Sequence, residues 1–146
     1  MRAVVQRVLS ARVSVGGDAV GALEGPGFVV LLGVRSGDGV PQAVAMAQKL
    51  WNLRIMADAE GRMNRSLAET GGGLLVISQF TLYGDTAKGR RPSFVEAAPG
   101  QVAEPLVERV VAELRGLGAA VATGRFGAKM LVELANDGPV TVLVET

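Results

Sequence analysis

The sequence predicts an α+β fold in which a curved, largely antiparallel β-sheet, barrel-like in shape, carries two main helices. Short β-rich segments recur along the chain, and tight glycine-containing turns separate many of them. Only two stretches repeat their apolar residues at helical spacing. Strands joined by short turns are typical of antiparallel sheets. With 146 residues, the chain is expected to fold as a single domain, residues 1–146.

The first third of the chain supplies several of the predicted strands. Residues 3–8 and 12–15 alternate in polarity and predict two short strands. Gly16-Gly17-Asp18 predicts a tight turn, and a strand over residues 19–23 follows it. Residues 28–34 are continuously apolar, which predicts a central strand covered on both faces.

Two helices and the remaining strands complete the predicted fold. Apolar residues at helical spacing predict helices over residues 41–53 and 102–117, and Pro41 suits a first helical turn. A short strand over residues 53–56 is expected to lead into a hairpin turn at residues 58–61. The other predicted strands cover residues 74–77, 120–123, 129–134 and 140–144.

Composition excludes several classes of protein. No apolar run approaches the roughly 18 residues that a membrane-spanning helix needs. The first residues do not resemble a signal peptide, and the chain has no cysteine for disulfides. A cytoplasmic location is therefore expected. The net charge of +1 lacks the strong basic excess typical of dedicated nucleic-acid-binding proteins.

The absence of histidine and cysteine restricts the chemistry most. It excludes a Ser-His-Asp triad, a Cys-His pair and the usual histidine-based zinc site. The sequence also has no clustered carboxylate motif, so we expect neither a metal nor a cofactor. An enzyme with this composition must use hydroxyls, carboxylates, amides, backbone N–H groups or groups of its substrate.

The first candidate site is Ser78-Gln79-Phe80-Thr81, which directly follows an apolar strand. Polar residues at a strand end can form a site on a rigid scaffold, and adjacent backbone amides there can form an oxyanion hole. On a straight strand, Gln79 and Thr81 would share a face. The alternative is a half-exposed strand end whose hydroxyls cap a turn, and spacing alone favours this alternative.

Three other segments each allow a functional and a structural interpretation. Asn136-Asp137-Gly138-Pro139 is typical of a turn, and a functional role requires the carbonyls of Gly138 and Pro139 to face a ligand. Three cations in the irregular segment 83–100 suit either phosphate contact or a solvated loop; they are Lys88, Arg90 and Arg91. Phe126 and Met130 suit either a pocket wall or core packing.

Taken together, these segments resemble the D-aminoacyl-tRNA deacylase family, first described as D-tyrosyl-tRNA deacylases, along the whole chain. Ser78–Leu82 is similar to one signature of the family, and Asn136–Thr141 is similar to the other. The other matching segments are Met1–Val8, Lys49-Leu50 with Leu53–Ile55, Gly61–Asn64, Lys88–Phe94 and Gly124–Met130. Neither signature departs from the family pattern.

The resemblance implies a homodimer that hydrolyses D-aminoacyl-tRNA and also glycyl-tRNA. In the family, the pair matching Gly138-Pro139 is joined by a cis peptide bond and enters the partner's pocket. Its carbonyls crowd the chiral carbon, so an L-side chain cannot fit. The residue matching Arg7 braces this pair, and Phe126 and Met130 are expected to contribute to substrate binding. For a tRNA substrate, Lys88, Arg90 and Arg91 are expected to bind the tRNA.

The resemblance also implies how ester hydrolysis proceeds without histidine. The free ribose hydroxyl of the terminal adenosine helps to activate water, and the backbone amides of Phe80 and Thr81 bind the oxyanion. Ser78, Gln79 and the Thr81 hydroxyl orient the ester and the adenosine. Direct attack by Thr81 is a competing view that the sequence leaves open, although no imidazole is present to activate it.

Two functions of other classes stay open at this point. Eukaryotic relatives of the family have been linked to DNA binding at replication origins, and a ligand-binding module without catalysis is a further alternative. The net charge of +1 disfavours a purely nucleic-acid-binding role. Release of a D-amino acid from charged tRNA would separate the three.

Overall fold

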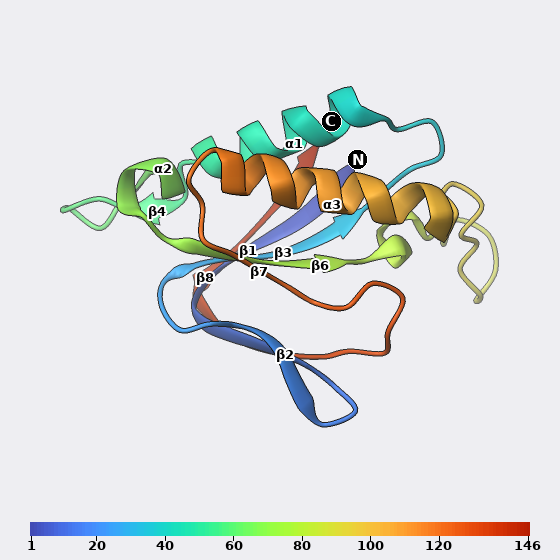
Figure 1. Ribbon diagram of the computed structural model, residues 1–146, viewed down its shortest axis with the longest axis horizontal. Helices are drawn as coiled ribbons and strands as arrows, with labels where there is room; N and C mark the ends of the chain where they lie inside the picture. Colours follow the sequence, from blue (N-terminus) through green and yellow to red (C-terminus); the bar gives the residue numbers. More distant parts are fainter.

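A mixed β-sheet forms the centre of the computed structural model, which describes residues 1–146 (Figure 1). Its strand order is β2-β1-β3-β6-β7. Strands β2 and β3 pair with different parts of one edge of β1, and β8 pairs with the opposite edge. The bounds are Arg2–Val15 for β1, Asp18–Leu23 for β2, Gly27–Gly33 for β3, Gly73–Ser78 for β6, Val121–Thr123 for β7 and Leu131–Glu145 for β8. The predicted α+β class with a curved sheet is confirmed.

The direction of the strands decides where a site can form. The pairs that involve β1 are antiparallel, whereas β3–β6 and β6–β7 are parallel. Leu32 of β3 lies opposite Ser78 of β6, so both strands end at the same edge of the sheet. Clefts at the carboxyl ends of parallel strands are a common place for ligand sites.

The two strands predicted near the start of the chain are one continuous strand, β1, so the predicted break is wrong. Ala11 pairs with Leu23 of β2 on one side and with Leu134 of β8 on the other. These two partners keep the backbone extended through residues 9–11, with only an irregularity in register between Val8 and Ala11. Local sequence could not indicate a partner strand more than a hundred residues away.

The predicted turn at residues 136–139 is also wrong, because this segment lies within the long strand β8. Val8 pairs with Asn136, and Gln6 pairs with Thr141, with a register shift between them. The intervening residues therefore form a bulge instead of reversing the chain.

Both predicted main helices are present and pack side by side on one face of the sheet (Figure 1). They are α1, Val40–Asn52, and α3, Gly100–Gly116, and Pro41 lies in the first turn of α1. The expected strand over residues 53–56 begins only at Met56. The hairpin turn expected at residues 58–61 is confirmed, because it joins β4, Met56–Ala57, to β5, Met63–Arg65. Elements that were not expected from the sequence are α2, Leu67–Thr70, and the 3-10 helix η1, Phe80–Tyr83. None of the helices has the length and apolar character needed to cross a lipid bilayer.

Two apolar cores lie on opposite faces of the sheet. The larger core packs α1 and α3 against the sheet and includes Phe28, Val30 and Leu74. The smaller core includes Val29 and Leu75 and lies within the curve of the sheet. The central strands β3 and β6 are thus buried on both faces, as the continuous apolar run of residues 28–34 predicted.

The sheet curls until β2 approaches β7, which makes it nearly a closed barrel. A side chain at Gly21 of β2 would collide with the backbone carbonyl of Thr123 in β7. The absence of a Cβ at Gly21 therefore permits this close approach.

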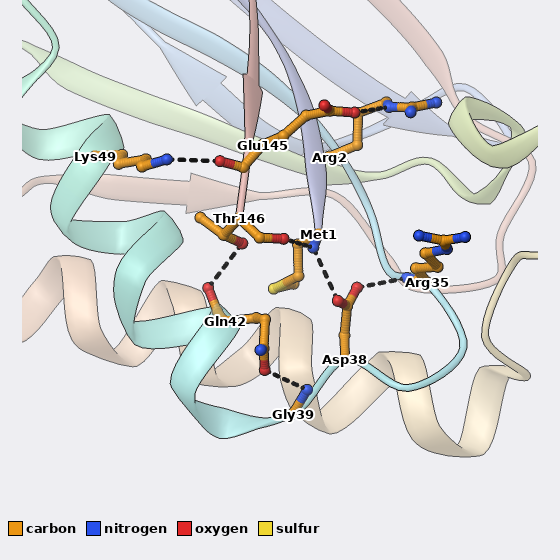
Figure 2. Close-up of polar contacts among 9 residues, drawn as sticks. All are labelled: Met1, Arg2, Arg35, Asp38, Gly39, Gln42, Lys49, Glu145 and Thr146. Atoms are coloured by element: carbon orange, nitrogen blue, oxygen red, sulfur yellow. Dashed lines mark hydrogen bonds and ion pairs between the residues drawn. The ribbon is translucent and has the colours of Figure 1, made fainter.

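The two ends of the chain meet beside the first turn of α1 (Figure 2). The amino group of Met1 donates hydrogen bonds to Asp38 Oδ1 at 3.0 Å and to the Thr146 carbonyl at 2.7 Å. Lys49 of α1 donates to the Glu145 carbonyl at 2.7 Å. These contacts tie the paired ends of β1 and β8 to α1 at the end of the sheet.

Candidate active site

A pocket of about 530 Å³ lies at the edge of the sheet where β3 and β6 end. Its walls come from these strand ends, from η1, from α3 and from the segment between β7 and β8. Thirteen of its 17 lining residues are hydrophobic. Five predicted site residues line it together: Ser78, Gln79, Phe80, Phe126 and Met130.

The chain changes direction sharply at this edge. Strand β6 ends at Ser78, Gln79 is neither helical nor extended, and η1 begins at Phe80. The strand does not continue through Gln79 and Thr81, so the geometry of a straight strand does not apply to this pair. Instead, the Gln79 side-chain amide donates a hydrogen bond to the Thr81 hydroxyl.

The first N–H groups of η1 are candidate donors to an oxyanion. The first N–H groups of a helical turn have no acceptor within that turn. Phe80 and Thr81 hold these first positions of η1. The Thr81 side chain itself is exposed and does not line the pocket.

Two aromatic rings form the rim of the pocket. Phe80 and Phe94 meet edge to face, with ring centroids 5.2 Å apart. Both rings remain accessible, with 57% of Phe80 and 39% of Phe94 exposed. A Cβ at Gly84 would come within 2.9 Å of the Phe94 ring, so Gly84 leaves room for this ring.

The segment between β7 and β8 forms another wall. A Cβ at Gly124 would lie 2.5 Å from the Met130 sulfur, so the missing side chain lets Met130 fold back over β7. Phe126 lines the pocket from the same segment. Small residues beside Phe126 and Met130 thus serve close packing and the pocket wall together.

No side chain that lines the pocket is ionisable. Tyr83, the last residue of η1, is buried and does not line the pocket, and burial raises the pKa of its phenol above the ordinary value. Tyr83 therefore stays protonated at neutral pH and is not a base. A hydrolytic reaction in this pocket has to rely on backbone donors, hydroxyls, the Gln79 amide and groups of the substrate.

Metal removal provides the first testable prediction. The chain has no group of three or more histidine, cysteine, aspartate or glutamate residues positioned to hold a metal ion. We expect exhaustive chelation to leave the hydrolysis rate unchanged. A steady-state assay before and after chelation checks this, with readdition of zinc and of magnesium. A rate that falls on chelation and returns only with one added metal would contradict the prediction.

Gly138 and Pro139 lie outside the pocket of their own chain. They occupy the bulge of β8, both are exposed, and the peptide bond between them is cis, as predicted. Gly138 has a φ of +125°, a conformation that residues with side chains rarely adopt.

Arg7 packs against this bulge from the opposite strand. Its Nε atom lies 3.0 Å from Asp137 Oδ2, and a Cβ at Gly138 would be 3.3 Å from its Nη2 atom. Its Nη1 atom donates to the Ile55 carbonyl at 2.8 Å, and only 12% of the side chain is exposed. Arg7 thus connects the bulge to the segment that precedes β4.

Asn136 closes the base of the bulge. Its Oδ1 atom accepts the Val140 N–H at 3.2 Å, and its amide donates to the Thr141 hydroxyl at 3.3 Å. The Gln6 amide lies 3.4 Å from the same hydroxyl. These side chains hold the two ends of the bulge together around Gly138 and Pro139.

The three cations predicted to bind tRNA lie on a loop beside the pocket. Backbone hydrogen bonds between Asp85 and Ser93, at 2.7 and 2.9 Å, close the base of this loop. Lys88, Arg90 and Arg91 are exposed within it and form no ion pair. None of them lines the pocket, whereas Phe94, just beyond the closed base, does.

Some residues of this pocket were not expected from the sequence. Val34, just after β3, and Val107 of α3 line the wall, but a valine has no functional group that would indicate a site residue in the sequence. Phe94 could have been predicted as a pocket residue, because it follows the basic loop directly in the sequence. The contact between Arg7 and Asp137 joins residues that are far apart in the sequence.

Comparison with known proteins defines the class of protein to which this chain is similar. A family model described as D-Tyr-tRNA(Tyr) deacylase matches residues 4–145. A D-aminoacyl-tRNA deacylase from Acidothermus cellulolyticus is 61% identical over 145 residues, covering 99% of this chain and 99% of that protein. One from Heliobacterium modesticaldum is 59% identical over 145 residues, covering 99% and 96%. These relatives are deacylases, enzymes that hydrolyse an acyl bond.

The chain belongs to the D-Tyr-tRNA(Tyr) deacylase family, as its resemblance predicted. Solved structures agree on the fold. A protein described as c-Myc DNA Unwinding Element Binding Protein superposes with a TM-score of 0.93 at 38% identity, covering 100% of this chain and 99% of that one. A probable eukaryotic D-amino acid tRNA deacylase superposes with a TM-score of 0.85 at 19% identity, covering 99% and 98%.

Proposed function

We propose that the protein hydrolyses the ester of D-aminoacyl-tRNA, and of glycyl-tRNA, and releases free tRNA with the D-amino acid or glycine. The observation that carries the mechanism is a pocket that adjoins the start of η1 and has no ionisable side chain in its lining. Family membership supplies the substrate class. Such substrates place the reaction in the cytoplasm, where translation takes place.

The chemistry follows from the groups at the edge of β6. Water adds to the carbonyl carbon of the ester, and the N–H groups of Phe80 and Thr81 donate to the oxyanion that forms. When the intermediate collapses, the bond to the ribose oxygen breaks and that oxygen takes a proton. The neighbouring ribose hydroxyl of the terminal adenosine assists proton transfer, because the protein offers no base there. Ser78 and Gln79 orient the ester and the adenosine.

Chiral selection is proposed to come from a second copy of the chain. Gly138 and Pro139 are exposed and lie outside their own pocket, so a partner's pocket is the place where their carbonyls meet substrate. There they crowd the side of the chiral carbon that an L-side chain would occupy. Glycine has no side chain to exclude, which makes glycyl-tRNA a second substrate.

The edge of β8 supports a homodimer. β8 pairs only with β1, so one edge of this long strand has no partner within the chain. An exposed strand edge of this length can pair with a strand of another chain. Leu131 and Leu143, near the two ends of β8, are 63% and 68% exposed. An interface along β8 would bury these leucines and bring the bulge to the other subunit.

The basic loop is proposed to contact the sugar–phosphate backbone of tRNA. Lys88, Arg90 and Arg91 have no carboxylate partner, and the loop begins at the rim of the pocket. Contacts to phosphate position a nucleic acid without reading its sequence. One relative in structure is described as a DNA-unwinding-element-binding protein, but a net charge of +1 disfavours duplex binding as the main role.

The second prediction tests this function directly. Purified protein is expected to hydrolyse D-tyrosyl-tRNA and glycyl-tRNA and to spare L-tyrosyl-tRNA. Release of labelled amino acid from each substrate provides the measurement, and uncatalysed hydrolysis of each ester serves as the control. Equal rates on the two tyrosyl enantiomers would reject the proposed selection. Binding of tRNA with no release from any substrate would favour a binding module.

A further inference from the structure

A second groove adjoins the pocket. It has a volume of about 520 Å³ and runs between α3 and the residues that follow β7. Ser78, Val107 and Phe126 line both hollows. These three residues are shared by the two hollows, so a substrate held at Ser78 lies at the boundary between the pocket and the groove.

The groove differs chemically from the pocket. Only five of its 12 lining residues are hydrophobic, and four charged side chains face it: Glu104, Glu108, Arg115 and Arg125. Glu104 and Glu108 are one helical turn apart on α3. Neighbouring like charges at this spacing destabilise a helix slightly.

These charges are almost free of internal partners. No ion pair or side-chain hydrogen bond involves Glu104, Glu108 or Arg125. Arg115 donates one hydrogen bond, to the Val121 carbonyl at 3.0 Å, which holds its guanidinium beside the groove. By contrast, Arg109 and Glu113, which do not line the groove, pair with each other.

We propose that this groove binds the nucleotide that precedes the terminal adenosine of the tRNA. The inference rests on the proposed function, because the ester must lie at Ser78–Thr81 and the adenosine in the adjoining pocket. The next covalent unit is a phosphodiester, which guanidinium groups such as those of Arg115 and Arg125 bind well. In tRNA the base of that unit is cytosine. Its exocyclic amine is a donor that a glutamate carboxylate accepts.

The test compares two substrates of the whole protein. D-Aminoacyl-adenosine fills only the pocket, whereas D-aminoacyl-tRNA also fills the groove. Arg125→Ala is expected to raise KM for the tRNA substrate about fivefold and to reduce the slope of log KM against log salt by ~0.7, the value for one lost single-strand phosphate contact. Hydrolysis of D-aminoacyl-adenosine should change less than about twofold, because this smaller substrate has no phosphate that Arg125 could contact.

Arg109→Ala provides the matched control, because Arg109 is an exposed arginine of α3 outside the groove. It should leave both substrates and the salt slope unchanged. Arg125 is exposed and its side chain forms no hydrogen bond or ion pair, so its replacement should not impair folding. Fluorescence anisotropy of uncharged tRNA gives a second readout, with the same loss of affinity expected for Arg125→Ala and not for Arg109→Ala.

Base contact is tested separately with a penultimate uridine in place of cytidine. The wild type should bind this tRNA more weakly, and Glu104→Gln combined with Glu108→Gln should reduce the difference between the two tRNAs. Arg125→Ala behaving like Arg109→Ala on tRNA would overturn the inference. So would a salt slope that changes only when Lys88, Arg90 and Arg91 are replaced. A wild type inactive on both substrates would overturn the proposed function as well.

Discussion

Removing the 2′ hydroxyl of the terminal adenosine, with the ester on the 3′ oxygen, is expected to slow hydrolysis at least about a hundredfold. Positioned proton transfer typically contributes roughly 10²–10⁴-fold to a rate. The pocket has no ionisable side chain to replace the missing group, and Tyr83, whose pKa burial raises, stays protonated. Single-turnover rates on the ribose and deoxyribose substrates measure the effect, and competition with unlabelled substrate confirms that both bind.

Thr81→Ala is expected to retain measurable activity in the same assay. The Thr81 side chain is exposed and outside the pocket lining, and the N–H of residue 81 survives the substitution. Loss of the hydrogen bond with Gln79 should reduce the rate about tenfold or less, the effect of a typical net hydrogen bond of ~1 kcal/mol. Thr81→Ser, which keeps the hydroxyl, is the matched control.

The opposite pattern would support Thr81 as the nucleophile. In that case Thr81→Ala would be inactive, an acyl-enzyme would be trapped in the wild type, and the deoxyribose substrate would react at nearly the normal rate. Because a nucleophilic threonine needs an activating base, this result would also require a base that the pocket lining does not contain.

Gly138→Ala is expected to lower discrimination against L-tyrosyl-tRNA by at least about tenfold, equivalent to ~1.4 kcal/mol. The new Cβ would lie 2.7 Å from Val140 Cγ2 and 2.9 Å from the Val140 nitrogen. The bulge must therefore shift, and the carbonyls that exclude the L-side chain shift with it. The ratio of kcat/KM for the D- and L-tyrosyl substrates is the quantity to measure.

Asn136→Ala tests the same mechanism without adding a side chain. It removes the bonds to Val140 and Thr141 that close the bulge, so the selectivity ratio should fall. Asn136→Asp keeps an acceptor for the Val140 N–H and should recover part of the loss. A role in folding alone would lower both rates together and leave the ratio unchanged.

The control for Gly138→Ala is Gly16→Ala. Gly16 also has a positive φ, +61°, but a Cβ at this position would meet nothing within 4 Å, and Gly16 is remote in sequence from the candidate site. Both substitutions should lower stability through backbone strain of roughly 1–3 kcal/mol. Only Gly138→Ala should change the selectivity ratio. Unchanged selectivity in Gly138→Ala would mean that this bulge does not exclude the L-enantiomer.

Local patterns in the sequence were sufficient to predict the α+β class, both main helices and the central strand over residues 28–34. These features depend on local patterns, namely helical spacing for the helices and a continuous apolar run for the strand. The absence of histidine and cysteine likewise restricted the chemistry, because composition does not depend on the fold. The two signature segments, Ser78–Leu82 and Asn136–Thr141, indicated the family.

The arrangement of those segments depends on strand pairing that forms only in the folded chain. The sequence predicted strand breaks at residues 9–11 and 136–139, but pairing between β1 and β8 keeps the first segment extended and makes the second a bulge. The turn into η1 brings Gln79 and Thr81 into hydrogen-bond contact, which the spacing of these residues did not reveal.

The separation between the pocket and the Gly138 bulge is likewise a property of the folded sheet. The parallel pairing of β3 and β6 creates the pocket at one edge, whereas the bulge lies on β8, beyond β1. Contacts such as Arg7 with Asp137 join residues more than a hundred positions apart. A local pattern carries no information on such pairs, because their distance depends on which strands become neighbours in the sheet.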